Sequence, residues 1–341
     1  MNITLPFRFI IYAKKVYSFF VRRDFDFLML YTNRDCTLDC LYCYGKDQYS
    51  TQGDILSLDE YYSVIDQAKS LGARSILFGR VGEPLGNKNV LKLIEYVFKK
   101  RMKPVICTNG LFINKEMAQF LYGCNAAVII KVDSLSPEIQ NKLAGKQAYI
   151  YRKYKYKYKG VNHVDMIPEG LYCLLKKGFG RNLLWPYKPS VILHAVLSKI
   201  NKPFFEELLL FSRANKLKII LQPLRYCSSI EKNKDQLLLS SQDYEDINSL
   251  ANNILGKEFE LFQQSQQYFF CIGRRPIIDE YGQLLCFLPS RKVVGNIRKE
   301  SLSTLWHRRT MMDDYNFALQ NRCTCHNLNE CPLAYKAMGI S

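Results

Sequence analysis

Short apolar runs alternate with longer amphipathic stretches from Phe27 to about Gln222. The apolar runs have the length of strands and are bounded by polar or turn residues, whereas the stretches between them repeat apolar residues at helical spacing. We therefore predict strands at Phe27–Thr32, Ser75–Phe78, Pro104–Thr108, Ala126–Val132, Ser190–Leu197 and Lys218–Leu221. We predict helices at Leu58–Leu71, Asn87–Lys100, Lys115–Leu121, Pro168–Lys177 and Lys202–Asn215.

This alternation of strands and helices indicates a parallel sheet of the α/β class. With six strand–helix units, the expected architecture is a partial (β/α)6, TIM-like barrel. In such folds the functional residues lie at the carboxyl ends of the strands, on the loops that follow them. The residues directly after each predicted strand are therefore the first candidates for a site.

Two segments break the alternation. Tyr149–Lys159 interleaves lysine and tyrosine; as a strand it places Tyr154, Tyr156 and Tyr158 on one face and its lysines on the other. It follows the fourth strand, so we expect it on the loop side of the barrel, where it can hold an acidic or phosphorylated substrate. A solvated loop with incidental charge is the alternative. Beyond about Gln222 a helix is predicted at Ser241–Leu255, and a cysteine-rich tail follows.

The charge balance is basic. Lys and Arg number 48 against 31 Asp and Glu, a net charge of +17, while 48% hydrophobic and 23% charged residues are ordinary for a globular protein. The excess favours an acidic partner. No recognised nucleic-acid-binding motif accompanies the tyrosine–lysine run, so nucleic acid is not the expected partner.

The first 25 residues are apolar, aromatic and basic. Their uninterrupted apolar runs are shorter than the roughly 20 residues that span a bilayer. We expect a basic amphipathic helix at residues 1–25 that packs on the main domain, with a position on a membrane surface as the alternative.

The chain has 12 cysteines, clustered toward its two ends. A secreted disulfide scaffold is much shorter, and no secretory signal with a cleavage site opens the chain. The clustering is typical of metal ligation in a reducing compartment, and we expect a cytoplasmic protein.

Cys36, Cys40 and Cys43 lie in one loop directly after the first strand. Iron–sulfur clusters are held by cysteine thiolates, normally four for a [4Fe–4S] cluster. Three thiolates leave one iron open to an external chelator, and the amino and carboxylate groups of S-adenosylmethionine (SAM) fit that role. The alternatives are a zinc site, which would need a fourth ligand that is not nearby, and three unrelated buried cysteines.

This loop, with Tyr42 before its last cysteine, resembles the signature of the radical SAM superfamily. The resemblance continues at later strand ends, with Val81 standing where the family has its first glycine. It implies that a [4Fe–4S] cluster cleaves SAM to a 5′-deoxyadenosyl radical, which takes hydrogen from a substrate. It implies SAM contacts for Tyr42, Gly82, Glu83, Pro84, Thr108, Asn109, Asp133 and Ser134. Turn formation and helix capping are the alternative roles of Thr108, Asn109, Asp133 and Ser134.

A second cysteine cluster comprises Cys271, Cys286, Cys323, Cys325 and Cys331. Together with Val294-Gly295-Asn296-Ile297 and the Leu302…Trp306 stretch, it resembles the SPASM domain, which implies one auxiliary [4Fe–4S] cluster. Zinc is the alternative, since Cys₄ sites use the same ligands. The tail departs from the SPASM pattern at Cys323 and Tyr335, which favours a shortened, twitch-like form with one cluster. Phe287 stands where the sulfatase-maturing branch has a carboxylate base.

These features predict three parts: the helix at 1–25, a radical SAM partial barrel at 26–235 and a small C-terminal cysteine-rich iron–sulfur domain at 236–341. The resemblance favours modification of a ribosomally made peptide by a cross-link, a thioether or an epimerisation. The alternatives are dehydrogenation or rearrangement of a small molecule such as a sugar or nucleotide, and a non-catalytic metal protein that binds nucleic acid. We expect an acidic electron donor such as a flavodoxin or ferredoxin. No residue stands out as the catalytic acid or base.

Overall fold

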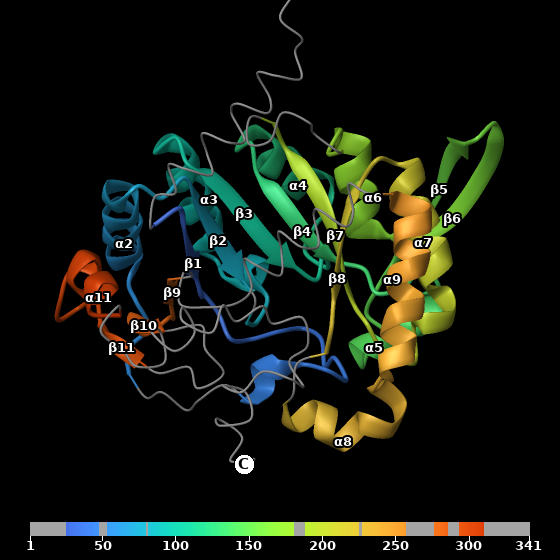
Figure 1. Cartoon of the computed structure of the whole chain (residues 1–341). Helices are drawn as coiled ribbons and strands as arrows, with labels where there is room; N and C mark the ends of the chain where they lie inside the picture. Colours follow the sequence, from blue (N-terminus) through green and yellow to red (C-terminus); the bar gives the residue numbers. More distant parts are fainter. Residues whose placement is uncertain are drawn as a thin grey trace, which may run out of the picture.

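The computed structural model describes residues 25–47, 53–79, 81–180, 188–224, 227–256, 276–285 and 293–309. All six predicted strands are confirmed, as β1 (Phe27–Leu30), β2 (Ser75–Gly79), β3 (Lys103–Thr108), β4 (Ala127–Lys131), β7 (Ser190–Val196) and β8 (Lys218–Gln222). They pair in parallel in the order β1-β2-β3-β4-β7-β8, and Figure 1 shows them at the centre of the molecule. The α/β prediction is therefore confirmed.

The five predicted connecting helices also form: α2 (Leu58–Leu71), α3 (Val90–Lys99), α4 (Lys115–Gly123), α6 (Glu169–Lys177) and α7 (Phe205–Ala214). The start of α2 shows why the sequence determines these boundaries. The Ser57 hydroxyl accepts a hydrogen bond from the Glu60 amide, and the Glu60 carboxylate accepts one from the Ser57 amide at 2.7 Å. This reciprocal cap satisfies two backbone donors that a helix start leaves unpaired.

The strands are buried on both faces, which explains their near-continuous apolar sequences. Leu28 and Leu30 of β1 face the helical layer and pack in the main core with Val64 and Ile65 of α2. Met29, between them, faces the other side of the sheet and packs in a smaller cluster with Tyr31, Val81 and Ile277. The sheet thus has an outer core beneath the helices and a smaller inner cluster.

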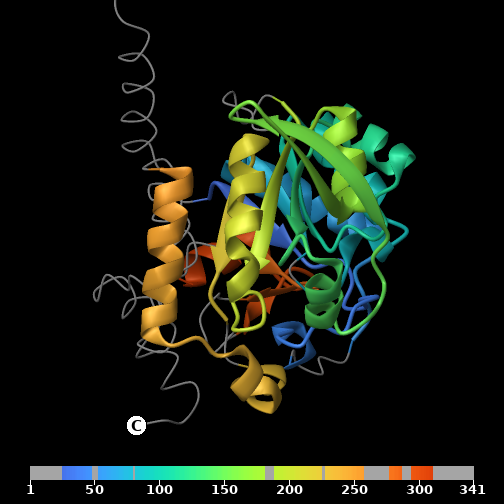
Figure 2. The same cartoon turned by 90° about the vertical axis from the view of Figure 1, so that its right-hand side faces the viewer.

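The connection from β4 to β7 is the longest in the described part of the chain. It contains α5 (Pro137–Ala144) and then a two-stranded antiparallel hairpin, β5 (Tyr151–Tyr158) and β6 (Val161–Pro168), before α6. The tyrosine–lysine segment forms a strand, the conformation whose two faces were worked out above, whereas α5 and β6 were not predicted. Figures 1 and 2 show the hairpin along the outside of α6 and α7.

The described residues beyond β8 add helices to the helical layer and short strands to the edge of the sheet beside β1. After α8 (Ser228–Leu237), the predicted helix forms as α9 (Ser241–Leu255) and packs beside α7 (Figure 2). The short β9 (Ile277–Ile278) pairs in parallel with β1, and β10 (Gln283–Leu285) and β11 (Val293–Asn296) extend the sheet antiparallel, followed by α11 (Leu302–Arg309). The division at residue 235 stays a prediction.

The prediction for the N-terminal segment falls almost entirely outside the described residues. Of the N-terminal helix predicted at 1–25, only Phe25 lies within the described residues, where its ring packs edge-on against Trp306 of α11 at a centroid distance of 4.8 Å. No described helix combines the length and apolar character needed to cross a membrane.

Candidate functional site

The loop that carries Cys36, Cys40 and Cys43 leaves β1 at the carboxyl end of the parallel sheet, toward the bottom of Figure 1. The last carbonyls of α5 hold this loop: the Asp39 amide donates to Ala144 O at 3.0 Å and the Leu41 amide to Leu143 O at 3.1 Å. Helix ends leave such carbonyls without a partner inside the helix, so the loop satisfies them. The contact fixes the backbone between the cysteines.

Gly145 makes this contact possible. It ends α5 with a φ of 68°, a left-handed conformation that favours glycine, and a Cβ there would lie 2.1 Å from Asp39 O. Any larger residue would push the loop away from α5. The close approach of α5 to the cysteine loop therefore requires glycine at position 145.

The three thiols are suited to a cluster. Cys36 is exposed, and Cys40 and Cys43 are partly buried. Burial raises the pKa of Cys40 to about 11 and also raises the pKa of Cys36, so both thiols would lose their protons only as they bind metal.

Within the described residues, no three His, Cys, Asp or Glu side chains converge closely enough to hold a single metal ion. A cubane cluster does not require such convergence, because each thiolate binds a different iron. Three thiolates in one loop are the donor set that a [4Fe–4S] cluster with one open iron takes.

Glu83 is the buried carboxylate of the site. It follows β2, is 1% exposed and accepts hydrogen bonds from the Thr108 hydroxyl at 2.6 Å and from the Asn109 amide at 2.7 Å. Burial raises the pKa of Glu83 to about 7, against the lowering effect of these hydrogen bonds. Among the described residues it forms no ion pair with a basic side chain, so a cationic ligand would supply the charge that its surroundings lack.

Asn109 joins this carboxylate to the cysteine loop. While its backbone amide bonds to Glu83, its side-chain amide donates to Cys36 Sγ at 3.7 Å and to Thr37 Oγ1 at 3.3 Å. Hydrogen bonds to sulfur are one of the means by which proteins tune iron–sulfur clusters. Thr108 and Asn109 of β3 and its turn thus lie against both the carboxylate and the first cysteine.

The turn before Glu83 is packed tightly against the start of the same loop. Gly82 has a φ of 65°, and a Cβ there would lie 2.2 Å from Asn33 O. The Glu83 amide donates to Asp35 O at 2.8 Å, and Pro84 is buried at the first position of a short 3₁₀ turn, Pro84–Gly86. Gly82 therefore allows the segment after β2 to approach the cysteine loop.

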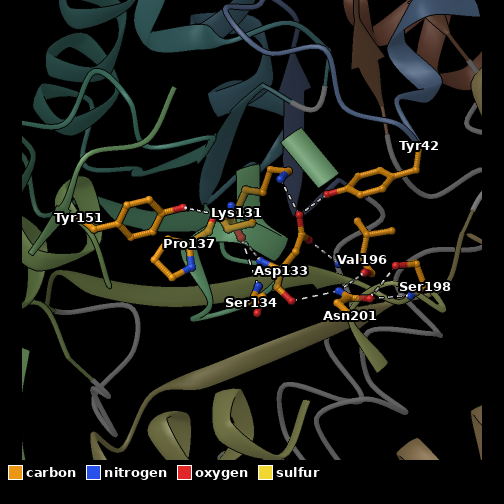
Figure 3. Close-up of polar contacts among 10 residues, drawn as sticks. Tyr42, Lys131, Asp133, Ser134, Pro137, Tyr151, Val196, Ser198 and Asn201 are labelled. Carbon is orange, nitrogen blue, oxygen red and sulfur yellow. Dashed lines mark hydrogen bonds and ion pairs between the residues drawn. The ribbon is translucent and has the colours of Figure 1, made fainter. Parts of the chain in front are cut away.

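Asp133 forms a second polar cluster (Figure 3). It is 1% exposed, pairs with Lys131 Nζ at 2.5 Å and accepts hydrogen bonds from the Tyr42 hydroxyl and from the Val196 amide at 2.9 Å. Since Tyr42 lies between Cys40 and Cys43, this carboxylate holds the cysteine loop against β4 and β7. Ser134 is also buried, and its hydroxyl accepts from the Ser136 amide at 3.1 Å, which is the turn-forming alternative considered above.

Two residues that sequence reasoning missed complete this cluster. The Asn201 side-chain amide donates to Asp133 O at 3.0 Å and to Val196 O at 2.9 Å (Figure 3), and Gln140 Oε1 accepts from the Asp133 amide at 2.8 Å. Asn201 lies in a polar turn directly after β7, which is a weak signal for a site. Gln140 has no comparable signal, because it lies within the polar sequence of α5.

The predicted residues therefore form two adjoining groups around the cysteine loop. The first unites Cys36 with Gly82, Glu83, Thr108 and Asn109, and the second links the loop through Tyr42 to Asp133. Their contacts with SAM stay a prediction. The five cysteines predicted for the auxiliary cluster, Cys271, Cys286, Cys323, Cys325 and Cys331, lie outside the described residues.

Parts of this chain are similar to known sequences. Residues 30–158 match the family model of the radical SAM superfamily. The chain is 39% identical over 88 residues to Fe-coproporphyrin III synthase of Methanosarcina barkeri, covering 26% of this chain and 22% of that protein. It is 34% identical over 122 residues to GTP 3′,8-cyclase of Desulforamulus reducens, covering 34% of this chain and 37% of that protein. The chain thus spans well under two thirds of these relatives.

Solved structures share the fold over most of the chain. Streptococcus suis SuiB bound to the precursor peptide SuiA superimposes with a TM-score of 0.60 at 15% identity, covering 94% of this chain and 73% of that one. The enzyme anSMEcpe with bound AdoMet and the Cp18Cys peptide gives a TM-score of 0.58 at 14% identity, covering 92% of this chain and 87% of that one. At this level of identity the likeness establishes the fold alone. The family match covers residues 30–158, the part of the chain that carries the cysteine loop, Glu83, Asn109 and Asp133.

Proposed function

We propose that this chain, which contains a radical SAM domain, is an enzyme that cleaves SAM reductively and uses the radical to take hydrogen from a carbon atom of its substrate. The observation that carries the proposal is the three-cysteine loop at the carboxyl end of the sheet, with the buried Glu83 beside it. When bound, a [4Fe–4S] cluster with one open iron supplies the electron that splits SAM into methionine and a 5′-deoxyadenosyl radical.

The residues of this chain would position that chemistry. Cys36, Cys40 and Cys43 would hold the cluster. Glu83 would bind the cationic amino group of SAM, because its carboxylate has no described cationic partner and is already oriented by Thr108 and Asn109. In this proposal Gly82 and Pro84 shape the turn that presents Glu83, and Tyr42, Asp133 and Ser134 hold the loop near the adenine.

For the substrate, we propose a ribosomally made peptide. The supporting observations are the fold shared with SuiB and anSMEcpe, both solved with bound peptides, and the five tail cysteines, of which four would ligate one auxiliary [4Fe–4S] cluster. When bound, such a cluster would supply an electron acceptor. The electron donor would be an acidic flavodoxin or ferredoxin, complementary to the net charge of +17.

A small-molecule substrate is the second candidate. It is favoured by the two curated relatives, which are named as a porphyrin synthase and a GTP cyclase. Those matches cover 26% and 34% of this chain, whereas the fold shared with the two peptide-bound structures extends over 94% and 92% of it. This is why we place the peptide first.

Formation of 5′-deoxyadenosine tests the proposed activity. The full chain is reconstituted with iron and sulfide without oxygen, reduced and mixed with SAM. We expect 5′-deoxyadenosine from the wild type and none from Cys40→Ala, with Cys124→Ala, a buried cysteine between α4 and β4, as the matched control that stays active. Equal product from wild type and Cys40→Ala would refute the proposal. Counting iron tests the tail: about eight irons per chain agree with two clusters, and about four contradict the auxiliary one.

A further inference from the structure

The β5–β6 hairpin presents two chemically different faces. The register pairs Lys153 with Met166, Lys155 with Val164 and Lys157 with Asn162 on one face, called the outer face here. Tyr154, Tyr156 and Tyr158 and their partners on β6 occupy the opposite, inner face. Alternation along a strand produces this division, because successive side chains point to opposite sides.

The inner face is used for packing. The ring centroid of Tyr154 lies 5.9 Å from that of Phe211 in α7 and 6.4 Å from that of Tyr172 in α6. Tyr156 packs on Phe211 at 5.5 Å, and its hydroxyl donates to Asp165 at 2.7 Å. These contacts attach the hairpin to the helical layer and leave the outer face toward solvent.

The outer face combines charge and apolar surface. Lys153, Lys155 and Lys157 are exposed, and beside them Val164 is 56% and Met166 37% exposed. The outer positions of both strands include no acidic residue. Alternate residues of a strand are about 6.6 Å apart, and this is also the repeat of alternate side chains in an extended peptide. Carboxylates at every second position of such a peptide would therefore face successive lysines.

We infer that the outer face of the β5–β6 hairpin binds an extended acidic segment of the peptide substrate, and this inference rests on the proposed function. The carboxylates of the segment pair with Lys153, Lys155 and Lys157. Its apolar residues contact Val164 and Met166.

The position of the hairpin agrees with this role. At its base, Tyr149 and Tyr151 pack with Leu38 and Ala144 beside the cysteine loop. Its tip lies toward the opposite end of the sheet (Figures 1 and 2). A segment bound along the lysines therefore runs from the tip toward the cysteine loop, and the residues that follow it reach the site. Only the base, and not the whole segment, lies on the loop side where the sequence placed it.

The same geometry disfavours two other partners. An electron donor has to come close to the cluster, whereas most of this face extends from the base of the hairpin toward the opposite end of the sheet. Single-stranded nucleic acid binds through aromatic side chains on which bases stack, and here Tyr154 and Tyr156 of β5 pack inward against α6 and α7.

Fluorescence anisotropy of the reconstituted full chain tests the inference. The probe is a labelled peptide of alternating Glu and Val, compared with one of alternating Gln and Val. The test variant carries Lys153→Glu, Lys155→Glu and Lys157→Glu. The control variant carries Lys69→Glu, Lys92→Glu and Lys115→Glu, three exposed lysines on α2, α3 and α4, so both variants have the same net charge.

We expect the acidic peptide to bind the wild type and the control variant about equally and the hairpin variant about tenfold more weakly, since each exposed ion pair contributes up to about fivefold. Equal weakening in both variants would overturn the inference, because it would show binding to net charge alone. Tighter binding of a single-stranded oligonucleotide or of anionic phospholipid vesicles through the same lysines would overturn it as well.

Turnover of SAM without peptide separates this inference from the proposed function. The hairpin variant is expected to form 5′-deoxyadenosine at the wild-type rate, because its substitutions lie outside the cysteine loop. If the wild type forms that product but binds the acidic peptide no better than the neutral one, the inference fails and the proposed function stands. If the wild type forms none, the proposed function fails whatever the peptide does.

Discussion

Replacing Asp133 with asparagine should destabilise the protein more than any exposed charge change. The Asp133 side chain is fully buried and that of Lys131 is 13% exposed, with 2.5 Å between Lys131 Nζ and the carboxylate. Burial alone would lower the pKa of Lys131, but the charge of Asp133 raises it above its ordinary value overall. Asp133→Asn removes that compensation and leaves a buried ammonium group without its counterion.

The expected loss is on the order of 3 kcal/mol, the lower end for breaking a buried ion pair by removing one partner. At about 2 °C per kcal/mol for a large domain, the thermal midpoint should fall by about 6 °C. The assay is thermal unfolding of the metal-free protein, followed by circular dichroism at neutral pH.

Two further variants test whether the loss of stability is electrostatic. Lys131→Met combined with Asp133→Asn should recover most of the midpoint, because no charge is then buried alone and the introduced amide can still accept hydrogen bonds. Glu95→Gln, which breaks an exposed pair with Lys99, should leave the midpoint unchanged. A double variant as unstable as Asp133→Asn alone would refute the electrostatic explanation.

Three further predictions concern the residues around the cysteine loop. Gly145→Ala should reduce the iron bound after reconstitution, because its Cβ would lie 2.1 Å from Asp39 O. Gly178→Ala, at a similar helix end where no atom comes nearer than 3.7 Å, should bind iron normally, and equal iron in both variants would contradict the clash. Because burial raises the pKa of Glu83 from 4.5 to about 7, the folded state binds this proton more tightly than the unfolded state. The metal-free wild type should therefore lose stability relative to Glu83→Gln as the pH rises from about 4.5 to about 7, and thermal midpoints that change in parallel across this range would count against it. Asn109→Ala should make the reduction potential of the cluster more negative, because it removes the hydrogen bond to Cys36 Sγ, and a potential measured by redox titration that does not move would exclude that role.

The sequence was sufficient to predict the strands and helices that have a clear apolar pattern. Strands buried on both faces, such as β1 and β3, have continuous apolar sequences, and their order along the chain implies a parallel sheet. Helix α5 was missed because eight residues with polar Gln140 and Asn141 among the buried ones show no clear apolar stripe. Strand β9 has only two residues and is recognisable only through its pairing with β1.

Part of the site could also be predicted, from the order of the strands along the chain. Because parallel strands end at one edge of the sheet, Glu83, Thr108 and Asn109 could be expected near the cysteine loop, and the structure brings them there. The hydrogen bonds of Asn201 and Gln140 to Asp133 could not be expected, since buried amides leave no periodic pattern in the sequence. Likewise, the approach of α5 to the loop depends on tertiary packing, and only Gly145 hints at it.

The central claim is that Cys36, Cys40 and Cys43 hold a [4Fe–4S] cluster with one iron open to SAM. Electron paramagnetic resonance of the reduced, reconstituted protein tests it most directly, with Cys40→Ala identifying which signal belongs to this cluster. We predict that SAM changes that signal in the wild type. A signal that SAM leaves unchanged, or a protein that retains zinc and shows no cluster signal, would contradict the claim.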